Sequence, residues 1–385
     1  MQFPIGVPLN VSRFAVSGTP GVNIGNMKVL VGMSGGVDSS VSAYILKQQG
    51  FEVEGVSLLL FETRGRKDPR SCCSLETVAE AGRTAEAIGI PHKVINARDL
   101  FMERVIGPFA GAYAQGLTPN PCILCNRHVK FPILLAEAEK CGADFIATGH
   151  YARVGREGGE TALKRGADQG KDQSYVLYML RKDELERLLL PLGGLRKTEV
   201  RQMAREAGLP VFNKPESQEI CFVDGKDYLP LVRALEPGSA ASGPVLDSSG
   251  VRIGTHKGLY AYTIGQRKGL GVSRPEPLYV YRIDPGENTV YVGPREKALI
   301  RRFEAGGLNW LMSGYEGRDF LFRAEVKVRS MMRASPARVW SEGKDAVHVE
   351  FDSPQWAPAP GQSAVFYEGE RVAGGGTIKK IFYPI

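Results

Sequence analysis

The residues best suited to chemistry begin with a glycine-containing stretch, residues 28–40. Its first half is apolar, as a buried strand is, and a helical pattern begins at Val37. Gly35 and Gly36 let backbone N–H groups approach an anion, and the helix start adds partial positive charge. We therefore expect a phosphate-binding loop. Its residues are Gly32, Met33, Ser34, Gly35, Gly36, Val37, Asp38 and Ser39.

This loop matches neither of the common nucleotide motifs. A Walker loop ends in Gly-Lys-Ser or Gly-Lys-Thr, and a dinucleotide fingerprint has glycines spaced G-x-G-x-x-G. The stretch therefore indicates a third type of loop, one that grips a pyrophosphate. Asp38 can hold Mg2+ or cap the helix. The alternative is an ordinary glycine-rich turn with an N-capping Asp or Ser.

The six cysteines are the second group of reactive side chains. Their uneven spacing in a chain of 385 residues does not indicate a secreted disulfide framework, so intracellular thiol or metal chemistry is the better interpretation. Cys122 and Cys125 form a Cys-x-x-Cys pair. Besides metal binding, such a pair can be a redox pair or two thiols of the core. Cys72 and Cys73 have no spaced partner and stay unassigned.

Strands that alternate with helical patterns must position these residues. The expected strands are residues 29–33, 51–56, 92–96 and 144–148. The alternation predicts an α/β fold with a doubly wound, Rossmann-like parallel sheet, whose ligands bind at the carboxyl ends of the strands. Leu58, Gly149 and His150 fall at such ends, together with the glycine loop. We therefore place Leu58 and Gly149 in the nucleotide site.

The sequence pattern changes beyond this sheet. Residues 234–244 are rich in Gly, Ser, Pro and Ala, which is typical of a linker. Short strands and glycine turns then predict a small central β-rich domain, and alternating strands predict a C-terminal β-barrel. The expected domains are a disordered extension at 1–26, the α/β domain at 27–233, the central domain at 234–298 and the barrel at 299–385.

Composition narrows the class of protein. A hydrophobic content of 43% and a charged content of 24% are ordinary for a soluble globular protein. The net charge of +7 fits a polyanionic partner without proving one. Because no apolar run approaches the ~18 residues of a membrane span, we expect a cytoplasmic protein with no membrane association.

Several motifs carry a specific resemblance to known proteins. Ser-Gly-Gly-Val-Asp-Ser at 34–39 resembles the PP-loop of the ATP pyrophosphatases. Pro-Asn-Pro-Cys at 119–122 and Ser-Gln-Glu-Ile-Cys-Phe at 217–222 make the whole chain similar to the tRNA-specific 2-thiouridylases. Four further segments fit the same family, beside the loop at Gly32 to Ser40: 148–151, 171–175, 262–268 and 360–364.

The resemblance implies a reaction and its partners. ATP, with Mg2+, would adenylate the C2 oxygen of the wobble uridine in tRNAs for Lys, Glu and Gln, and sulfur would then replace that oxygen. The partners would be the anticodon stem-loop and a sulfur-donor protein or another sulfide source. Chemically this makes sense, because the C2 oxygen leaves readily only as an AMP ester, and the incoming sulfur must be a strong nucleophile such as a persulfide.

The same resemblance assigns roles to individual residues. Asp38 belongs to the catalytic loop, Cys125 attacks or accepts sulfur, and Cys221 carries a persulfide, after which the two cysteines close as a disulfide. A buried apolar thiol is the alternative for Cys221, a capped structural histidine for His150, and a solvated loop for 171–173. The implied tRNA contacts are Asn120, Pro121, Cys122, His150, Lys171, Asp172, Gln173 and Gln362.

Cys122 departs from the pattern of many family members, which have Asp there. Together with Cys125 and Cys221 it makes three soft ligands, enough for a [4Fe-4S] cluster with one open iron or for an incomplete Zn2+ site. We favour the cluster, as related PP-loop tRNA thiolases use three cysteines in this way. Ligated thiolates cannot serve as free nucleophiles, so a cluster would exclude the persulfide roles.

Basic residues alternate along one expected strand of the barrel. Arg323, Lys327 and Arg329 fall on one strand face and are opposed only by Glu325. We expect this stripe to contact tRNA phosphates rather than to be random surface charge. Two rival functions stay open: an ATP pyrophosphatase that adenylates a small molecule, and a nucleotide-regulated RNA-binding protein without turnover.

Overall fold

The computed structural model describes most of the chain, in two compact units. The described residues are 26–61, 75–215, 220–223, 227–272, 274–317, 319–341, 343 and 345–383. The first unit comprises residues 1–98, 130–174 and 181–222, and the second comprises 99–129, 175–180 and 223–385. Residues 1–25, Cys72, Cys73 and residues 217–219 lie outside the described residues. These compact units do not follow the expected linear boundaries, which stay predictions.

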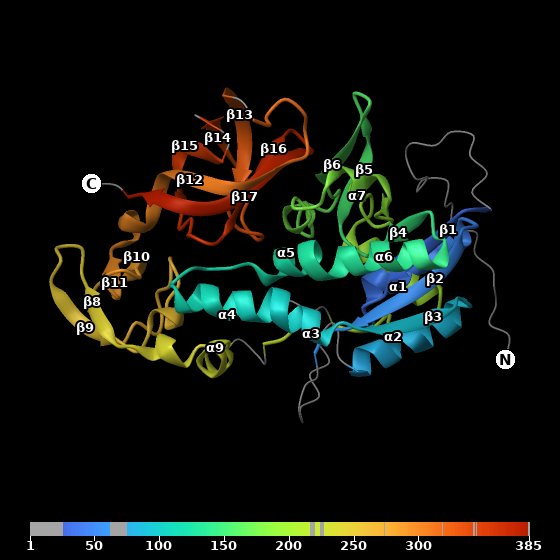
Figure 1. The fold of residues 1–385 in the computed structure, drawn as a ribbon, viewed down its shortest axis with the longest axis horizontal. Coiled ribbons are helices and arrows are strands. Elements are labelled where there is room, and N and C mark those ends of the chain that lie inside the picture. Colours follow the sequence, from blue (N-terminus) through green and yellow to red (C-terminus); the bar gives the residue numbers. More distant parts are fainter. Residues whose placement is uncertain are drawn as a thin grey trace. The chain divides into compact units, whose positions relative to one another are not determined.

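The first unit is built on a five-stranded parallel sheet (Figure 1). Its strands are β1 (Lys28–Gly32), β2 (Glu52–Leu59), β3 (His92–Asn96), β4 (Phe145–Ala147) and β7 (Leu188–Leu189). They lie in the order β3-β2-β1-β4-β7, so the central strand is β1. In register, Val31 is paired with Gly55 on one side and with Ala147 on the other. The strand that leads into the glycine loop is therefore held from both sides.

Helices cover both faces of this sheet. Those of the first unit are α1 (Val37–Gln48), α2 (Leu75–Ile88), α6 (Phe131–Cys141), α7 (Lys182–Glu186) and α8 (Lys197–Glu206). Val29 and Val31 of β1 pack with Ala43 of α1 and Ala81 of α2 in one buried cluster. Gly32 instead faces α6, where an added Cβ would lie 3.2 Å from Leu134. Because residues alternate between faces and both faces are covered, β1 is apolar from Val29 onward.

A β-hairpin lies between β4 and β7 along the chain of the first unit. It is formed by β5 (Ala152–Glu157) and β6 (Glu160–Arg165). Gly158 and Gly159 make its two-residue turn with φ values of 61° and 84°, conformations that favour glycine.

Helices of the second unit precede its sheets in the chain. They are α3 (Arg98–Phe101, which begins at the unit boundary), α4 (Gly107–Ala114), α5 (Pro121–Cys125) and α9 (Leu229–Leu235). Segments Met102–Ile106 and Asn126–Lys130 are π-helical. A central sheet has the order β10-β11-β8-β9. Its strands are β8 (Gly243–Leu246), β9 (Arg252–His256), β10 (Tyr279–Asp284) and β11 (Thr289–Gly293).

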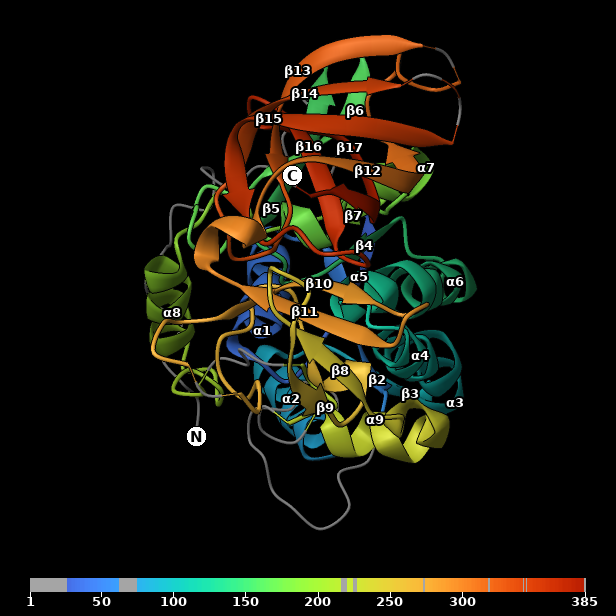
Figure 2. The ribbon, with the colours of Figure 1, turned by 90° about the vertical axis from the view of Figure 1, so that its left-hand side faces the viewer.

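Six antiparallel strands close into a barrel at the end of the chain. They are β12 (Leu299–Trp310), β13 (Phe320–Lys327), β14 (Ser335–Ser341), β15 (Ala346–Trp356), β16 (Ser363–Glu368) and β17 (Arg371–Phe382). Neighbours run in the order β12-β15-β14-β13-β16-β17, and β12 pairs with β17 to close the ring. Figure 2 shows β13, β14 and β15 side by side.

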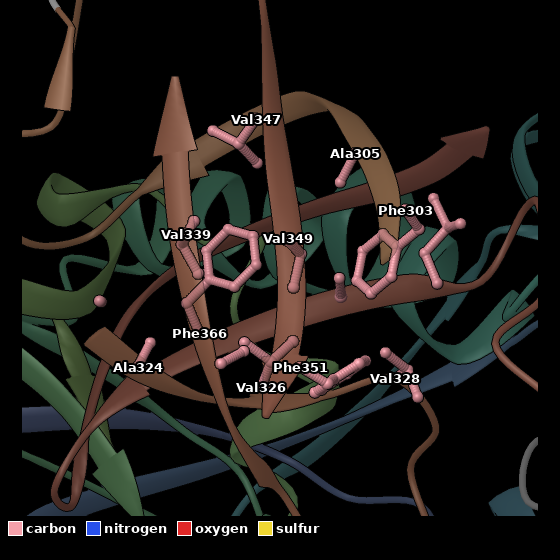
Figure 3. Close-up of a cluster of buried hydrophobic side chains, with 14 of the residues drawn as sticks. Phe303, Ala305, Ala324, Val326, Val328, Val339, Val347, Val349, Phe351 and Phe366 are labelled. Atoms are coloured by element: carbon pink, nitrogen blue, oxygen red, sulfur yellow. The ribbon is translucent and has the colours of Figure 1, made fainter. Parts of the chain in front are cut away.

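The barrel interior is a packed apolar core. Alternate residues such as Val347, Val349 and Phe351 of β15 point inward and meet Phe303 and Phe366 (Figure 3). A closed barrel leaves no unpaired strand edge, and its inner face is filled by side chains. The predicted fold class is thus confirmed: a parallel α/β sheet, a small β-rich region and a C-terminal barrel. Within the described residues, no helix is long and apolar enough to cross a membrane.

Candidate nucleotide loop and cysteine loop

The glycine loop of the first unit joins β1 to α1, as expected. Gly36 is the N-cap residue of α1, and no side chain caps the helix there. The first N–H groups of any helix lack intrahelical partners, so this end can receive an anion. Gly35 has φ +69°, and a Cβ on it would lie 2.2 Å from the carbonyl oxygen of Thr77. Only glycine fits this backbone conformation and this close approach.

Serine hydroxyls brace the loop from inside. Oγ of Ser39 accepts a hydrogen bond from N of Ser34 at 3.1 Å. The hydroxyls of Ser39 and Ser40 both donate to the carbonyl oxygen of Gly36, at 3.3 and 2.8 Å. Both side chains are buried, whereas Ser34 is exposed. The loop is therefore preorganised by its own sequence.

Asp38 makes contacts that its position in the sequence does not indicate. Its Oδ1 accepts a hydrogen bond from the hydroxyl of Tyr151 at 2.7 Å. Nζ of Lys197 lies 2.6 Å from Oδ1 and 2.7 Å from Oδ2. Lys197 is only 8% exposed. The carboxylate that we expect to meet Mg2+ thus already holds a buried ammonium group beside the loop.

Lys197 is itself fixed at the first residue of α8. Its N–H donates to Oδ2 of Asp168 at 3.0 Å. A lysine at a helix N-terminus opposes the helix dipole, and this unfavourable placement indicates a compensating anion. That signal was present in the sequence, but Lys197 and Tyr151 were not predicted as site residues.

Residues 171–173, expected to contact tRNA, support the same region. Oε1 of Gln173 accepts a hydrogen bond from N of Tyr151 at 2.9 Å. Oδ1 of Asp172 accepts from the N–H groups of Gly166 and Ser174, both at 3.0 Å. Lys171 is partly exposed. The Gln173 bond holds Tyr151, whose hydroxyl in turn donates to Asp38; the tRNA contacts of residues 171–173 stay a prediction.

The strand β4 ends against the loop. A Cβ on Gly149 would lie 2.6 Å from N of Ser39, so the two backbones touch, as the predicted nucleotide site requires. Leu58, near the carboxyl end of β2, is 8% exposed and pairs with Ile95. The structure therefore brings Gly149 directly to the loop and places Leu58 on an adjacent strand.

His150 is buried in the first unit. Its Nδ1 lies 2.8 Å from Oγ1 of Thr148, and its ring stacks on Phe131. Burial, with a smaller effect from the charge of Lys130, holds the pKa of His150 well below its usual range. His150 is therefore neutral at pH 7, which favours the structural alternative over a charged phosphate contact. Its contact with tRNA stays a prediction.

The cysteine loop belongs to the second unit. Asn120 is the N-cap of α5, where its Oδ1 accepts a hydrogen bond from N of Cys122 at 3.1 Å, and Pro121 occupies the first helical turn. Cys122 is exposed, whereas Cys125 is only 9% exposed. At a spacing of three residues the two cysteines lie one turn apart on the same helix face.

The barrel braces the approach to this loop. N of Thr118 donates to O of Pro360 at 2.9 Å. Nε2 of Gln362 donates to O of Thr118 at 3.0 Å. Gly361, with φ +90°, lies so close that an added Cβ would be 3.0 Å from N of Thr118. Gln362, predicted to contact tRNA, therefore also positions the segment that leads into Cys122.

Three basic residues do not form the expected exposed stripe. Arg323 pairs with Asp352 on the barrel surface. Lys327 is 8% exposed, with its Nζ 5.8 Å from the ring centre of Tyr175. Nη2 of Arg329, beyond the end of β13, donates to O of Ile264 at 2.9 Å and to O of Ala357 at 2.8 Å. The expectation of one exposed basic face is wrong, because Lys327 is buried and Arg329 binds backbone carbonyl groups. The tRNA contacts of these residues stay a prediction.

The third candidate cysteine, Cys221, lies in the first unit and is partly exposed. Cys122 and Cys125 lie in the second unit. Across the described part of the chain, no group of three or more His, Cys, Asp or Glu side chains forms a metal site. The thiolates of Cys122 and Cys125 fit a soft metal by their chemistry and spacing, and they supply two ligands.

Family models cover almost the whole chain. Residues 27–225 match the tRNA methyl transferase HUP domain, residues 236–294 the tRNA methyl transferase PRC-barrel domain, and residues 300–378 the aminomethyltransferase beta-barrel domain. Together these matches span the parallel sheet, the central sheet and the barrel.

Curated relatives are similar over their full length. A tRNA-specific 2-thiouridylase MnmA from Clostridioides difficile is 43% identical over 92% of this chain and 99% of its own. Another from Carboxydothermus hydrogenoformans is 45% identical over 93% of this chain and 99% of its own. Among solved structures, the U34-tRNA thiolase NcsA from Methanococcus maripaludis is 18% identical over 57% of this chain and 67% of its own, at a TM-score of 0.34. A score that low carries no argument.

Proposed function

Because the chain belongs to the tRNA-specific 2-thiouridylase family, we propose that it uses ATP to replace the C2 oxygen of a tRNA uridine with sulfur. The observation that carries the proposal is the phosphate loop, with Asp38 at the start of α1 and the ammonium group of Lys197 bound to it. The same chain presents a buried cysteine, Cys125, at the end of a short helix. An enzyme of this kind needs both a site for ATP and a thiol.

The first step makes the oxygen of the base a leaving group. The C2 oxygen attacks the α-phosphorus of ATP, the bond to the β-phosphate oxygen breaks, and pyrophosphate departs. N–H groups at the start of α1 bind the phosphates, and the Lys197 ammonium group lies beside them, paired with Asp38. Asp38 holds Lys197 and offers carboxylate oxygens, the ligands that Mg2+ prefers.

The second step brings sulfur to C2. In the persulfide route the terminal sulfur on Cys221 attacks C2 and AMP leaves; the Cys125 thiolate then attacks Sγ of Cys221, which frees the thiolated base and leaves a disulfide. An external dithiol must reduce that disulfide before the next turnover. Cys125 sits at the end of α5 with low exposure, which protects a reactive thiol from other oxidants.

A [4Fe-4S] cluster is the other route, and the donor chemistry of the cysteines supports it. Cys122 and Cys125 would each supply a thiolate from α5, and Cys221 is the third candidate ligand. Such a cluster, when bound, would supply an open iron able to carry the incoming sulfide. We favour this route, because the family resemblance leads us to expect Asp where this chain has an exposed Cys122.

The partners follow from the reaction. We propose that the substrates are the tRNAs for Lys, Glu and Gln, and that the enzyme binds their anticodon stem-loop. A sulfur-donor protein or another sulfide source delivers the sulfur. A net charge of +7 supports a polyanionic partner. Taking the target base out of its stack costs energy, so binding must also come from contacts elsewhere on the tRNA.

A tRNA-dependent assay separates this function from small-molecule adenylation. Anaerobically purified protein is incubated with Mg-ATP, tRNA, a dithiol and either sulfide or a persulfide donor, and both AMP and 2-thiouridine are quantified. We expect equal amounts of AMP and 2-thiouridine, and no AMP without tRNA. A Cys125→Ser variant should lose 2-thiouridine, whereas the matched Cys141→Ser variant should keep it. AMP formation with a small molecule and no tRNA would overturn the proposal.

A further inference from the structure

A second lysine contacts the phosphate loop, on the carbonyl side of Gly35. Nζ of Lys214 donates to the carbonyl oxygen of Gly35 at 3.0 Å and also binds the carboxylate of Glu80. The Lys214 side chain is 13% exposed, and that of Glu80 is 27% exposed. Neither residue belongs to the loop motif or to any contact assigned above.

The backbone of Lys214 is itself held in place. Its N–H donates to O of Val211 at 3.0 Å, and its carbonyl oxygen accepts from Nη1 of Arg201 at 3.3 Å. Glu80 lies one turn after Thr77 in α2, and the carbonyl of Thr77 is the group that touches Gly35. Helix α2 therefore contacts the loop twice, once directly and once through Lys214.

These contacts fix the orientation of one peptide group. In a trans peptide the C=O of one residue and the N–H of the next point in opposite directions. No cis peptide is found among the described residues. An ammonium group that holds the Gly35 oxygen thus also fixes the direction of the Gly36 N–H. Since Gly36 is the N-cap of α1, this N–H stands at the start of the anion-binding end.

Glycine alone would leave this peptide free to rotate. Gly35 adopts φ +69°, a region that glycine enters and leaves at little cost, so a flipped peptide would aim a carbonyl oxygen where a phosphate is to bind. A buried positive charge on the carbonyl opposes that flip. Because the Glu80 carboxylate neutralises this ammonium group, its effect on ATP acts through the direction of the peptide rather than through net charge.

We propose that Lys214 is a positioning residue of the ATP site, which orients the Gly35–Gly36 peptide toward the β- and γ-phosphates, and that Glu80 fixes its ammonium group. The proposal rests on ATP use, the first half of the proposed function, and not on sulfur transfer. Its distinctive consequence is selectivity: Lys214 matters for a nucleotide that carries a pyrophosphate and not for AMP.

Calorimetric titration of Mg-ATP and of AMP tests this without requiring thiolation. We expect Lys214→Met to weaken Mg-ATP binding by about tenfold or more and to leave AMP binding within about twofold. Lys214→Arg, which keeps charge and donors, should recover most of the affinity, and Glu80→Gln should show a smaller loss. Lys47→Met, an exposed lysine at the end of α1, is the matched control and should bind as wild type.

The alternative is that Lys214 only ties its segment to α2. In that case Lys214→Met would lower the thermal unfolding temperature and weaken ATP and AMP equally, or it would leave both affinities unchanged; either result overturns the proposal. If Lys214→Met does not fold, the Lys214→Arg and Glu80→Gln proteins carry the same comparison of ATP with AMP. Wild-type protein that binds ATP but fails to thiolate tRNA would count against the proposed function alone.

Discussion

Nζ of Lys197 lies within 2.7 Å of both carboxylate oxygens of Asp38, across 159 positions of the chain. The pair joins the start of α1 to the start of α8 inside one unit. The ammonium group of Lys197, which is mostly buried, therefore neutralises the Asp38 carboxylate beside the phosphate loop before ATP arrives. Asp38 therefore has a role in placing Lys197 as well as its expected role toward Mg2+.

Replacing Asp38 with Asn tests that double role. Asn keeps the size of the side chain but removes the charge that holds Lys197 and would meet Mg2+. We expect tRNA-dependent AMP formation to fall by about a hundredfold or more, while tRNA binding is retained. Asp99→Asn, an exposed acid in the first turn of α3, is the control. Unchanged AMP formation in the Asp38→Asn protein would remove Asp38 from the site.

The buried His150 predicts a dependence of stability on pH. Because the folded state lowers the pKa of His150, the unfolded chain binds a proton near pH 6.5 that the folded chain does not. The free energy of unfolding should then be intact above about pH 7 and decrease below about pH 6.5, by up to about 1.4 kcal/mol per pH unit. In His150→Asn that part of the decrease should disappear.

The measurement for His150 is urea unfolding of both proteins at several pH values. His92, whose pKa is also lowered by burial, is present in both proteins and cancels in the difference. Parallel stability curves for wild type and His150→Asn between pH 7 and 5 would contradict a buried, neutral His150.

Gly361 offers a test of how the barrel positions the cysteine loop. An added methyl group would lie 3.0 Å from N of Thr118 and 3.1 Å from Cβ of Leu117. Gly361→Ala should therefore shift the segment before Cys122 and reduce 2-thiouridine formation about tenfold or more, with Mg-ATP affinity unchanged. Thiolation and nucleotide titration are measured on the same preparation.

Gly369→Ala is the matched control for that change. Gly369 also has positive φ, but an added Cβ there meets nothing within 4 Å. Both variants should lose about 1 kcal/mol of stability from backbone strain, yet only Gly361→Ala should lose thiolation. Equal losses of activity in the two proteins would refute a positioning role for the Gly361 contact.

Features of the fold that a local sequence pattern encodes were predicted correctly. The apolar run before Gly35, the helix start at Val37 and the parallel sheet all agree with the structure. Each is set by neighbours within a few residues, through hydrophobic period, turn conformation or helix start. Fold class was therefore accessible from the sequence.

Contacts between distant segments were not predictable in this way. Lys197 and Lys214 reach the loop from segments more than 150 residues away, and no periodicity reports such a meeting. Strand alternation places Lys327 on the same face as Arg323. It does not reveal that Lys327 is buried near the ring of Tyr175. Burial of a charged side chain is a tertiary property, which is why the basic stripe was wrong.

Cys122 decides between the two sulfur routes. Cys122→Asp replaces a soft thiolate with a hard carboxylate, which is a poor ligand for iron in a cluster. We expect the anaerobically purified variant to lose iron, visible absorption and 2-thiouridine formation together, with Cys141→Ser unaffected. Full thiolation by an iron-free Cys122→Asp protein would refute the cluster and leave the persulfide route.

Oxygen tracing shows whether ATP adenylates the C2 oxygen of a tRNA uridine. A tRNA whose wobble uridine carries 18O at C2 is incubated with enzyme, Mg-ATP, a dithiol and either sulfide or a persulfide donor, and the mass of the released AMP is measured. Sulfur displaces the labelled oxygen while that oxygen is bonded to the phosphorus of AMP. We therefore expect one 18O in AMP for each 2-thiouridine formed. AMP without 18O, alongside normal 2-thiouridine, would contradict adenylation of the base.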